Sequence, residues 1–273
     1  MKITIANAAQ WDPPQNEFLN ALQKLHKDDL VRNAIEDAQR QMQPCELPHH
    51  INVVKSRLLA RHLIINQLCH PAHPSPAEAA IKKSEVLIST TVYGKPCTAF
   101  YKRGSFSVSH VANWCCCAYS ACNAIGVDIT AVHSNGHTLL PVILSKKETE
   151  FVRQRPPHQR SAFFAIYWAI KESILKALGL GLSSHLQMSD ISLAFKQDID
   201  ILSITELKPE IAASTPALPV TVSLKDNKGE KWMYSCVQIA GNPLHIFAAV
   251  LHNEKCVENI EWKFESYQSI LSR

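Results

Sequence analysis

The sequence has 273 residues, of which 46% are hydrophobic and 19% are charged, and its net charge at pH 7 is +4. These values are typical of a soluble globular protein of one large or two small domains, and they exclude an intrinsically disordered chain. Because the positive charge is spread along the chain without a basic run, we expect no nucleic-acid partner.

The cysteines and the N-terminal segment bear on the cellular compartment. The chain has nine cysteines and no Cys-x-x-Cys pair, which argues against a disulfide framework. The first five residues lead into polar sequence, and no apolar run reaches the ~20 residues that a membrane-spanning helix needs. We therefore expect a cytoplasmic protein with reduced thiols and no membrane partner.

The N-terminal part of the chain predicts one strand and two helices. Residues 3–11 begin as a short strand, and the apolar spacing over 16–42 predicts a helix. After a break rich in Pro and His, residues 52–65 predict a second helix. It carries three cations, Lys55, Arg57 and Arg61. These cations either face water on an amphipathic helix or hold a phosphate, and the pattern leaves both readings open.

The next segments predict strands and a turn. Residues 86–90 predict a strand that runs into the turn Tyr93-Gly-Lys-Pro96, with Lys95 at its tip. Residues 106–110 alternate as a strand does, and three consecutive cysteines follow within 114–118. Because successive residues of a strand point to opposite faces, these three thiols cannot bind one metal together. We expect a buried and inert strand there.

One acid interrupts an apolar strand. Residues 125–132 read Ile-Gly-Val-Asp-Ile-Thr-Ala-Val, and the only carboxylate among them is Asp128. A carboxylate inside such a run is costly to bury unless it is paired or binds a metal. The alternative is that Asp128 caps a neighbouring helix at the end of the strand.

A helix over 167–179 organises the C-terminal half. Its interior lacks Gly and Pro, and an apolar stripe is expected to be buried: Phe163, Ile166, Tyr167, Ile170, Ile174 and Leu178. Trp168, Glu172 and Lys176 recur every four residues on the opposite face. Taken alone, this pattern fits a solvated ion pair as well as a functional one.

The flanking segments predict a capped helix and an antiparallel meander. Ser145 and Glu148 have the spacing of a capping box, which favours a structural role for Glu148. Beyond the long helix, alternation predicts four strands, at 191–195, 220–224, 231–237 and 245–250, with a hairpin turn at 226–229. Residues 257–271 predict a polar amphipathic helix or a tail.

Three motifs follow one another along the chain. They are Tyr93-Gly-Lys-Pro96 with Phe106-Ser-Val-Ser-His110, then Gly126-Val-Asp128, then Trp168-Ala-Ile-Lys-Glu-Ser-Ile-Leu-Lys176. In this order they resemble the 4′-phosphopantetheinyl transferases of the Sfp type, over roughly residues 50–195. The long chain and Thr130 favour the eukaryotic members that resemble the aminoadipate-semialdehyde-dehydrogenase phosphopantetheinyl transferases.

The resemblance implies a fold and a reaction. The fold is α+β, a pseudo-dimer of two similar α/β lobes with the site in the cleft between them, and the chain is expected to be a monomer. We expect an N-terminal lobe at 1–118, a C-terminal lobe with the metal and catalytic residues at 119–255, and a helix or tail at 256–273. The implied reaction moves 4′-phosphopantetheine from coenzyme A to a serine of an apo carrier protein and releases adenosine 3′,5′-bisphosphate. Acyl carriers of fatty-acid synthesis, peptidyl carriers and the aminoadipate reductase of lysine synthesis are the candidate acceptors.

The resemblance also implies roles for single residues. Mg²⁺, or Mn²⁺, would be held by Asp128, Glu172 and Glu148, and either Glu148 or Glu172 would take the serine proton. Lys176 would stabilise the departing phosphate, and His110 belongs with these catalytic residues. Coenzyme A would be bound by Lys55, Lys95, Ser109, His110, Asp128, Lys171 and Lys176.

Some positions depart from the family pattern. Thr130 stands where many members carry a second acid, so we expect water in that metal position. Ser107 replaces an Asn, and Val53 replaces an acid before the first basic helix. Two other functions stay open: a Mg²⁺-dependent nuclease, which plasmid DNA would reveal, and an inactive module that binds coenzyme A without turnover.

Overall fold

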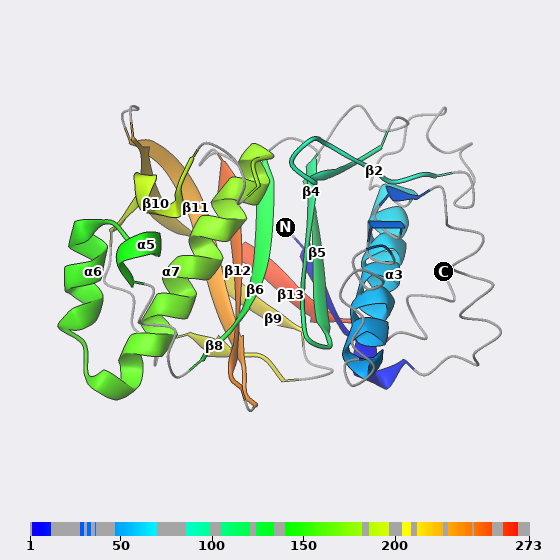
Figure 1. Ribbon diagram of the computed structural model, residues 1–273, viewed down its shortest axis with the longest axis horizontal. Coiled ribbons are helices and arrows are strands. Elements are labelled where there is room, and N and C mark those ends of the chain that lie inside the picture. The colour runs from blue at the N-terminus through cyan, green and yellow to red at the C-terminus, as the bar shows by residue number, and fades with distance from the viewer. Residues whose placement is uncertain are drawn as a thin grey trace.

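Two β-sheets lie face to face, and one long helix covers the outer side of each (Figure 1). The computed structural model describes residues 2–11, 28–29, 32–33, 36, 47–69, 86–98, 105–120, 124–133, 140–181, 186–196, 204–208, 212–225, 229–241, 243–252 and 259–266. The predicted helix over 16–42 and the turn at 226–229 lie largely outside these residues. The α+β fold with two sheet-and-helix lobes is as predicted.

The first sheet has the strand order β4-β5-β1-β13-β9. Its strands are β1 (Lys2–Asn7), β4 (Ser105–Val111), β5 (Trp114–Ser120), β9 (Ala213–Pro216) and β13 (Asn259–Phe264). The helix α3 (Leu47–Cys69) packs on its outer face, and the short helix η1 (Ala8–Gln10) follows β1. A small ribbon of β2 (Ser89–Thr90) and β3 (Pro96–Cys97) carries the turn with Lys95.

The second sheet has the strand order β6-β12-β11-β10-β7, and β8 pairs with β11. Its strands are β6 (Ile125–Ala131), β7 (Ile191–Phe195), β8 (Thr205–Glu206), β10 (Leu218–Leu224), β11 (Glu230–Ile239) and β12 (His245–His252). The helices nearby are α5 (Leu140–Ile143), α6 (Lys146–Arg153), α7 (Pro157–Leu178) and η5 (Met188–Asp190). The predicted antiparallel meander is confirmed, and α7 covers its outer face.

Strand β5 lies between two apolar layers, and its side chains point alternately into one and the other. Cys115 and Cys117 belong to the apolar cluster with α3, whereas Cys116 and Ala118 belong to the cluster between the two sheets. All three thiols are fully buried, and burial raises the pKa of Cys115 to about 12. The alternation of a strand therefore explains the triple cysteine, and the prediction of a buried, inert strand is confirmed.

The predicted C-terminal helix or tail is wrong at residues 259–264, which form β13. This strand pairs in parallel with β1, and its buried residues Ile260 and Trp262 alternate with exposed ones. A strand is favoured because these two side chains fill the core between the sheets, where a polar helix would leave them exposed. Strand β9 joins the same sheet through β13, although it lies within 119–255.

Strand β6 and helix α7 approach each other unusually closely at Gly126. A Cβ at this position would lie 1.7 Å from the backbone oxygen of Ser173 and 3.0 Å from the backbone nitrogen of Ala177. Only glycine can occupy this position without moving the helix. The Gly of the Gly-Val-Asp motif therefore sets the distance between Asp128 and the face of α7 that carries Glu172 and Lys176.

A row of serines joins β4 of the first sheet to β6 of the second. The hydroxyl oxygens of Ser105, Ser107 and Ser109 accept hydrogen bonds from backbone N–H groups of β6 at 3.5, 3.1 and 3.2 Å. The donors are Ile125, Val127 and Ile129. Side-chain hydroxyls thus stand where a further strand would place carbonyls, and they fix the register of β4 against β6.

None of the helices within the described residues is long and apolar enough to cross a membrane.

Candidate active site

A cleft of about 370 Å³ opens between the two lobes. Its walls come from α3, the β2–β3 turn, β4, β6 and α7, so both sheet-and-helix units contribute. The cleft contains the carboxylates of Asp128 and Glu172 and the cations of Lys176 and Arg57. The sequence motifs that were far apart along the chain therefore meet at one place.

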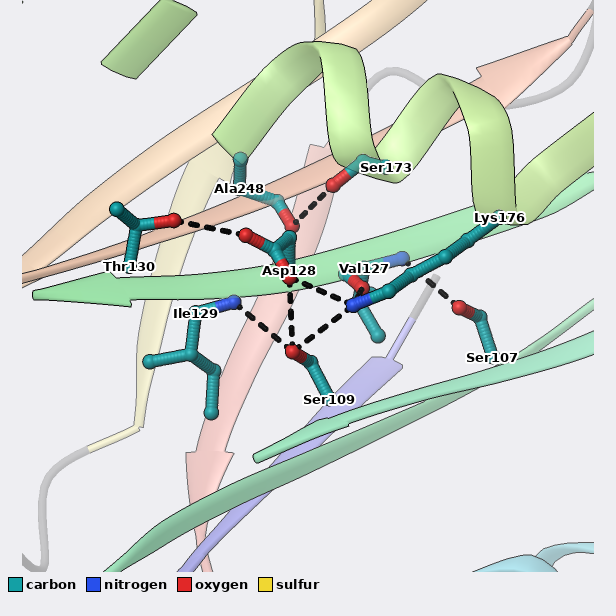
Figure 2. Close-up of polar contacts among 9 residues, drawn as sticks. All are labelled: Ser107, Ser109, Val127, Asp128, Ile129, Thr130, Ser173, Lys176 and Ala248. Carbon is teal, nitrogen blue, oxygen red and sulfur yellow. Dashed lines mark hydrogen bonds and ion pairs between the residues drawn. The ribbon is translucent and has the colours of Figure 1, made fainter. Parts of the chain in front are cut away.

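Asp128 lies in the middle of β6, and its residue is 5% exposed. Figure 2 shows three side chains that reach its carboxylate. Lys176 Nζ lies 2.6 Å from Oδ1, Ser109 Oγ donates to Oδ1 at 2.9 Å, and Thr130 Oγ1 donates to Oδ2 at 2.8 Å. Asp128 is therefore a paired, hydrogen-bonded carboxylate that faces the cleft, and the alternative of a helix cap does not apply.

Glu172 lies on α7 and is 8% exposed. Burial raises the pKa of its carboxyl to about 7, with a further increase from Asp128 and an opposing effect of Lys176. Its Oε1 atom is buried and receives no hydrogen bond within the described part of the chain. A buried carboxylate oxygen without a donor is costly, which marks Glu172 as a group that a ligand is expected to satisfy.

Lys176 lies one turn beyond Glu172 on α7, with a side chain that is 27% exposed. Besides Asp128, its ammonium contacts Ser109 Oγ at 2.9 Å and the carbonyl of Val127 at 3.2 Å (Figure 2). Its partner is therefore the acid of β6, which excludes the solvated pair with Glu172 as an explanation of the motif. The ammonium is held inside the cleft, where it can meet an anion.

Arg57 and His110 line the cleft together with Lys176. His110 lies on β4 and faces it, and the pKa of its imidazole is lowered to about 3 by burial and by the charges of Arg57 and Lys176. The ring is consequently neutral at physiological pH in these surroundings. A phosphate entering the cleft would counter the two cations, so these three residues form an environment suited to an anionic ligand.

Lys95 also lines the cleft, and its ammonium has a second contact. Nζ donates to the carbonyl of Ala177 at 2.9 Å, in the last turn of α7, and burial lowers the pKa of the amine. A cation at this end of a helix interacts favourably with the exposed carbonyls. Gly179, two residues after Ala177, caps the helix with φ 77°, and the predicted helix also ends at this residue. Lys95 therefore ties the turn of one lobe to the helix of the other.

Contrary to the prediction, Glu148 and Lys171 do not line the cleft. Lys171 Nζ lies 2.6 Å from Glu148 Oε2, and the lysine also donates to the carbonyls of Ile143 and Met188. The other carboxylate oxygen of Glu148 accepts from the backbone of Leu193 at 2.8 Å. The capping box of Ser145 and Glu148 is confirmed. The pair is buried and its charged groups are hydrogen-bonded to each other and to the backbone, so the predicted metal, base and phosphate roles do not suit these two residues.

The basic residues of α3 separate into different surroundings. Arg57 lines the cleft, Lys55 does not, and Arg61 is buried against Asp28 with Nε 2.7 Å from Oδ2. Lys55 is therefore not brought to the site, and Arg57 takes its place as the candidate phosphate contact. The sequence did point to Arg57 as one of three cations on a predicted helix, but the pattern could not show which of the three lines the cleft.

The residues at the cleft fit a divalent cation. Asp128 and Glu172 offer hard carboxylate oxygens, one of which has no hydrogen-bond donor among the described residues. No cluster of three or more His, Cys, Asp or Glu side chains that could hold a metal occurs in the described ranges. A site with two carboxylates suits Mg²⁺, because this ion typically keeps several water ligands and binds one or two carboxylates together with substrate phosphates.

Part of the chain that carries this site is similar to known proteins. The model of the 4'-phosphopantetheinyl transferase superfamily matches residues 124–224. The chain is 30% identical over 118 residues to the 4'-phosphopantetheinyl transferase Sfp of Bacillus subtilis, covering 43% of this chain and 51% of that protein. It is 34% identical over 86 residues to a holo-[acyl-carrier-protein] synthase of Geobacillus kaustophilus, covering 32% and 60%.

A third relative aligns with a longer stretch of this chain than the other two do. The phosphopantetheinyl transferase of a Thraustochytrium species is 27% identical over 164 residues, which is 54% of each chain. The chain thus spans about half the length of the curated relatives it matches. The matched stretch contains Asp128, Glu172 and Lys176, the three residues that meet in the cleft. Residues 124–224, which contain these three residues, are therefore similar to the 4′-phosphopantetheinyl transferase superfamily.

Proposed function

We propose that this protein transfers the 4′-phosphopantetheine group of coenzyme A to a serine hydroxyl of an apo carrier protein. The relatives are named phosphopantetheinyl transferases and a holo-[acyl-carrier-protein] synthase, which supports both the transferred group and the acceptor class. The observation that carries the proposal is the meeting of Asp128, Glu172 and Lys176 in one interlobe cleft beside Arg57 and His110.

The reaction needs a cleft that holds a diphosphate. The serine oxygen forms a bond to the phosphorus of the pantetheine phosphate, and the bond from that phosphorus to the bridging oxygen breaks. Adenosine 3′,5′-bisphosphate leaves with the electron pair of that bond. A divalent cation supplies charge neutralisation of the phosphate oxygens when bound at Asp128 and Glu172. Arg57 contributes positive charge from the α3 side of the same cleft.

The serine proton needs an acceptor, and Glu172 is the best placed. It lines the cleft, and its Oε1 atom receives no hydrogen bond among the described residues, so this oxygen is available to take a proton. We do not propose Glu148 for this role, because both of its oxygens are engaged in a buried network. Lys176 lies beside the acids and is positioned to stabilise the negative charge that develops on the leaving phosphate.

A transfer assay against several apo acceptors tests the proposed reaction and identifies the carrier. Purified protein is incubated with coenzyme A, Mg²⁺ and a panel of apo acceptors: an acyl carrier protein, a peptidyl carrier domain and the carrier domain of an aminoadipate reductase. Intact-mass spectrometry should show the gain of one phosphopantetheine on at least one of them, and EDTA should abolish the gain. No gain on any acceptor would contradict the proposal. Plasmid DNA incubated under the same conditions should stay intact.

A further inference from the structure

The carboxylate of Asp128 is held by two hydroxyl groups, one on each oxygen (Figure 2). Ser109 Oγ donates to Oδ1 from β4 of the first sheet, and Thr130 Oγ1 donates to Oδ2 from β6 itself. The two donors therefore approach from different elements. The carboxylate cannot turn about its last bond without breaking one of these hydrogen bonds.

The hydroxyl of Ser109 is fully used by these contacts. Its single proton goes to Asp128 Oδ1, and its two lone pairs accept from the backbone of Ile129 at 3.2 Å and from Lys176 Nζ at 2.9 Å. It has no remaining proton to donate to a phosphate. The contact with coenzyme A that the family resemblance implies for Ser109 therefore does not suit its side chain, which holds Asp128 and Lys176 instead.

Thr130 holds the other oxygen. A carboxylate can accept about four hydrogen bonds or metal bonds, two on each oxygen. Within the described part of the chain, Oδ1 receives two donors, Ser109 and Lys176, whereas Oδ2 receives the threonine hydroxyl. One acceptor position thus remains, and it is on Oδ2. A threonine in a strand is stiff about χ1, which suits a fixed hydrogen-bond donor.

We propose that Ser109 and Thr130 are positioning residues that fix the Asp128 carboxylate and direct the remaining acceptor position of Oδ2 to the divalent cation. The inference rests on the cation of the proposed function and explains how the site is organised with a threonine at position 130. Groups that hydrogen-bond a metal-binding carboxylate typically contribute about 10- to 100-fold to metal affinity, because they fix its orientation before the ion arrives.

The test measures cation binding directly, without turnover and without coenzyme A. The dissociation constant of Mn²⁺ is obtained from the electron paramagnetic resonance signal of free Mn²⁺, on the full chain. Thr130→Val keeps the shape of the side chain but removes its hydroxyl, and it should weaken Mn²⁺ binding about 10-fold or more. Thr130→Ser keeps the hydroxyl donor, so this variant should bind Mn²⁺ with a dissociation constant within about twofold of that of the parent protein. Ser109→Ala should weaken binding as Thr130→Val does.

The matched control is Ser105→Ala. Ser105 lies on the same face of β4 and accepts from β6 in the same way, but it does not contact Asp128 and lies outside the cleft. Its substitution should leave Mn²⁺ affinity unchanged. A role in folding alone would instead lower the unfolding temperature of the variants without changing their Mn²⁺ affinity, which would overturn the inference. If Thr130→Val does not fold by circular dichroism, Thr130→Ala carries the same comparison.

Asp128→Asn separates this inference from the proposed function. If Asp128→Asn abolishes Mn²⁺ binding while Thr130→Val and Ser109→Ala bind as the parent does, the positioning role is refuted and the cation site stands. If Asp128→Asn itself binds Mn²⁺ as tightly as the parent, the cation site of the proposed function is refuted together with the positioning role.

Discussion

Lys176 of α7 and Asp128 of β6 form an ion pair, with Nζ 2.6 Å from Oδ1, although 48 positions separate them along the chain. The pair spans the contact between a helix and an edge strand, and it lies in the cleft rather than on the solvated face of α7. Glu172, one turn earlier, stands at the same cleft with a buried carboxylate oxygen that lacks a donor among the described residues. Charge balance between these three residues is therefore central to the site.

Substitution of Lys176 should separate catalysis from binding. In Lys176→Met, the ammonium that we propose to stabilise the leaving phosphate is lost while the stem of the side chain is kept. We expect kcat of phosphopantetheine transfer to fall by about 100-fold or more, with a smaller change in KM for coenzyme A. Lys225→Met, at a side chain that is 68% exposed, serves as the control and should behave as the parent. An unchanged kcat for Lys176→Met would show that this lysine has a structural role and does not take part in catalysis.

The buried pair of Glu148 and Lys171 should affect stability and not chemistry. Glu148→Gln leaves the Lys171 ammonium buried without its counter-charge, so the free energy of unfolding should fall by about 3–5 kcal/mol. The double variant Glu148→Gln with Lys171→Met should lose less than the sum of the single variants. The exposed acid Glu150 of the same helix provides the control, Glu150→Gln. Urea denaturation measures these differences.

The same variants test whether Glu148 takes part in the reaction. Per folded molecule, Glu148→Gln should transfer phosphopantetheine at the rate of the parent protein. A fully folded Glu148→Gln protein with a strongly reduced kcat would show that this acid takes part in the reaction after all.

The contact at Gly126 should be intolerant of a single methyl group. Gly126→Ala would place Cβ 1.7 Å from the Ser173 carbonyl oxygen, so β6 and α7 must separate. We expect a loss of about 3 kcal/mol or more in the free energy of unfolding, at the upper end of what overpacking costs. Gly241→Ala has its nearest atom at 3.3 Å and should cost much less. Equal losses for the two variants would contradict the tight contact.

The titration of Glu172 should appear in the pH dependence of stability. Its pKa is raised from 4.5 to about 7, so the folded state binds a proton more tightly than the unfolded state does. This contribution to stability is fully present below pH 4.5 and is lost as the pH rises through 7. Relative to Glu172→Gln, which does not titrate, the parent should lose up to about 3 kcal/mol across this range.

The measurement is urea unfolding of both proteins from pH 4.5 to pH 8 in the presence of EDTA. Groups that titrate in both proteins cancel in the difference. Parallel stability curves for the parent and Glu172→Gln would show that this carboxyl has an ordinary pKa.

Features encoded by neighbouring residues were predictable from the sequence. The end of α7 at Gly179 and the capping box of Ser145 and Glu148 were predicted from the sequence, whereas the helix begins at Pro157, upstream of the predicted start at residue 167. The apolar stripe of α7 is buried as expected except at Leu178, which is 38% exposed in the last turn. Asp128 stood out because a carboxylate within an apolar strand needs partners.

Features that depend on distant pairing were not predictable in this way. The alternation of Ile260 and Trp262 was present as a strand signal, but its partner β1 lies at the other end of the chain. Lys171 and Glu172 are neighbours in one motif, yet a helix turns by about 100° per residue, and only packing decides which of them reaches the cleft. The contact of Ser109 with Asp128 likewise depends on how β4 is placed against β6.

The most direct test of the account is anomalous diffraction from crystals of this protein grown with Mn²⁺ and coenzyme A. We expect one manganese peak in the interlobe cleft, coordinated by the carboxylates of Asp128 and Glu172 and by the diphosphate. A manganese ion held elsewhere, at Glu148 for example, or coenzyme A bound in the cleft with no ion near these two acids, would contradict it.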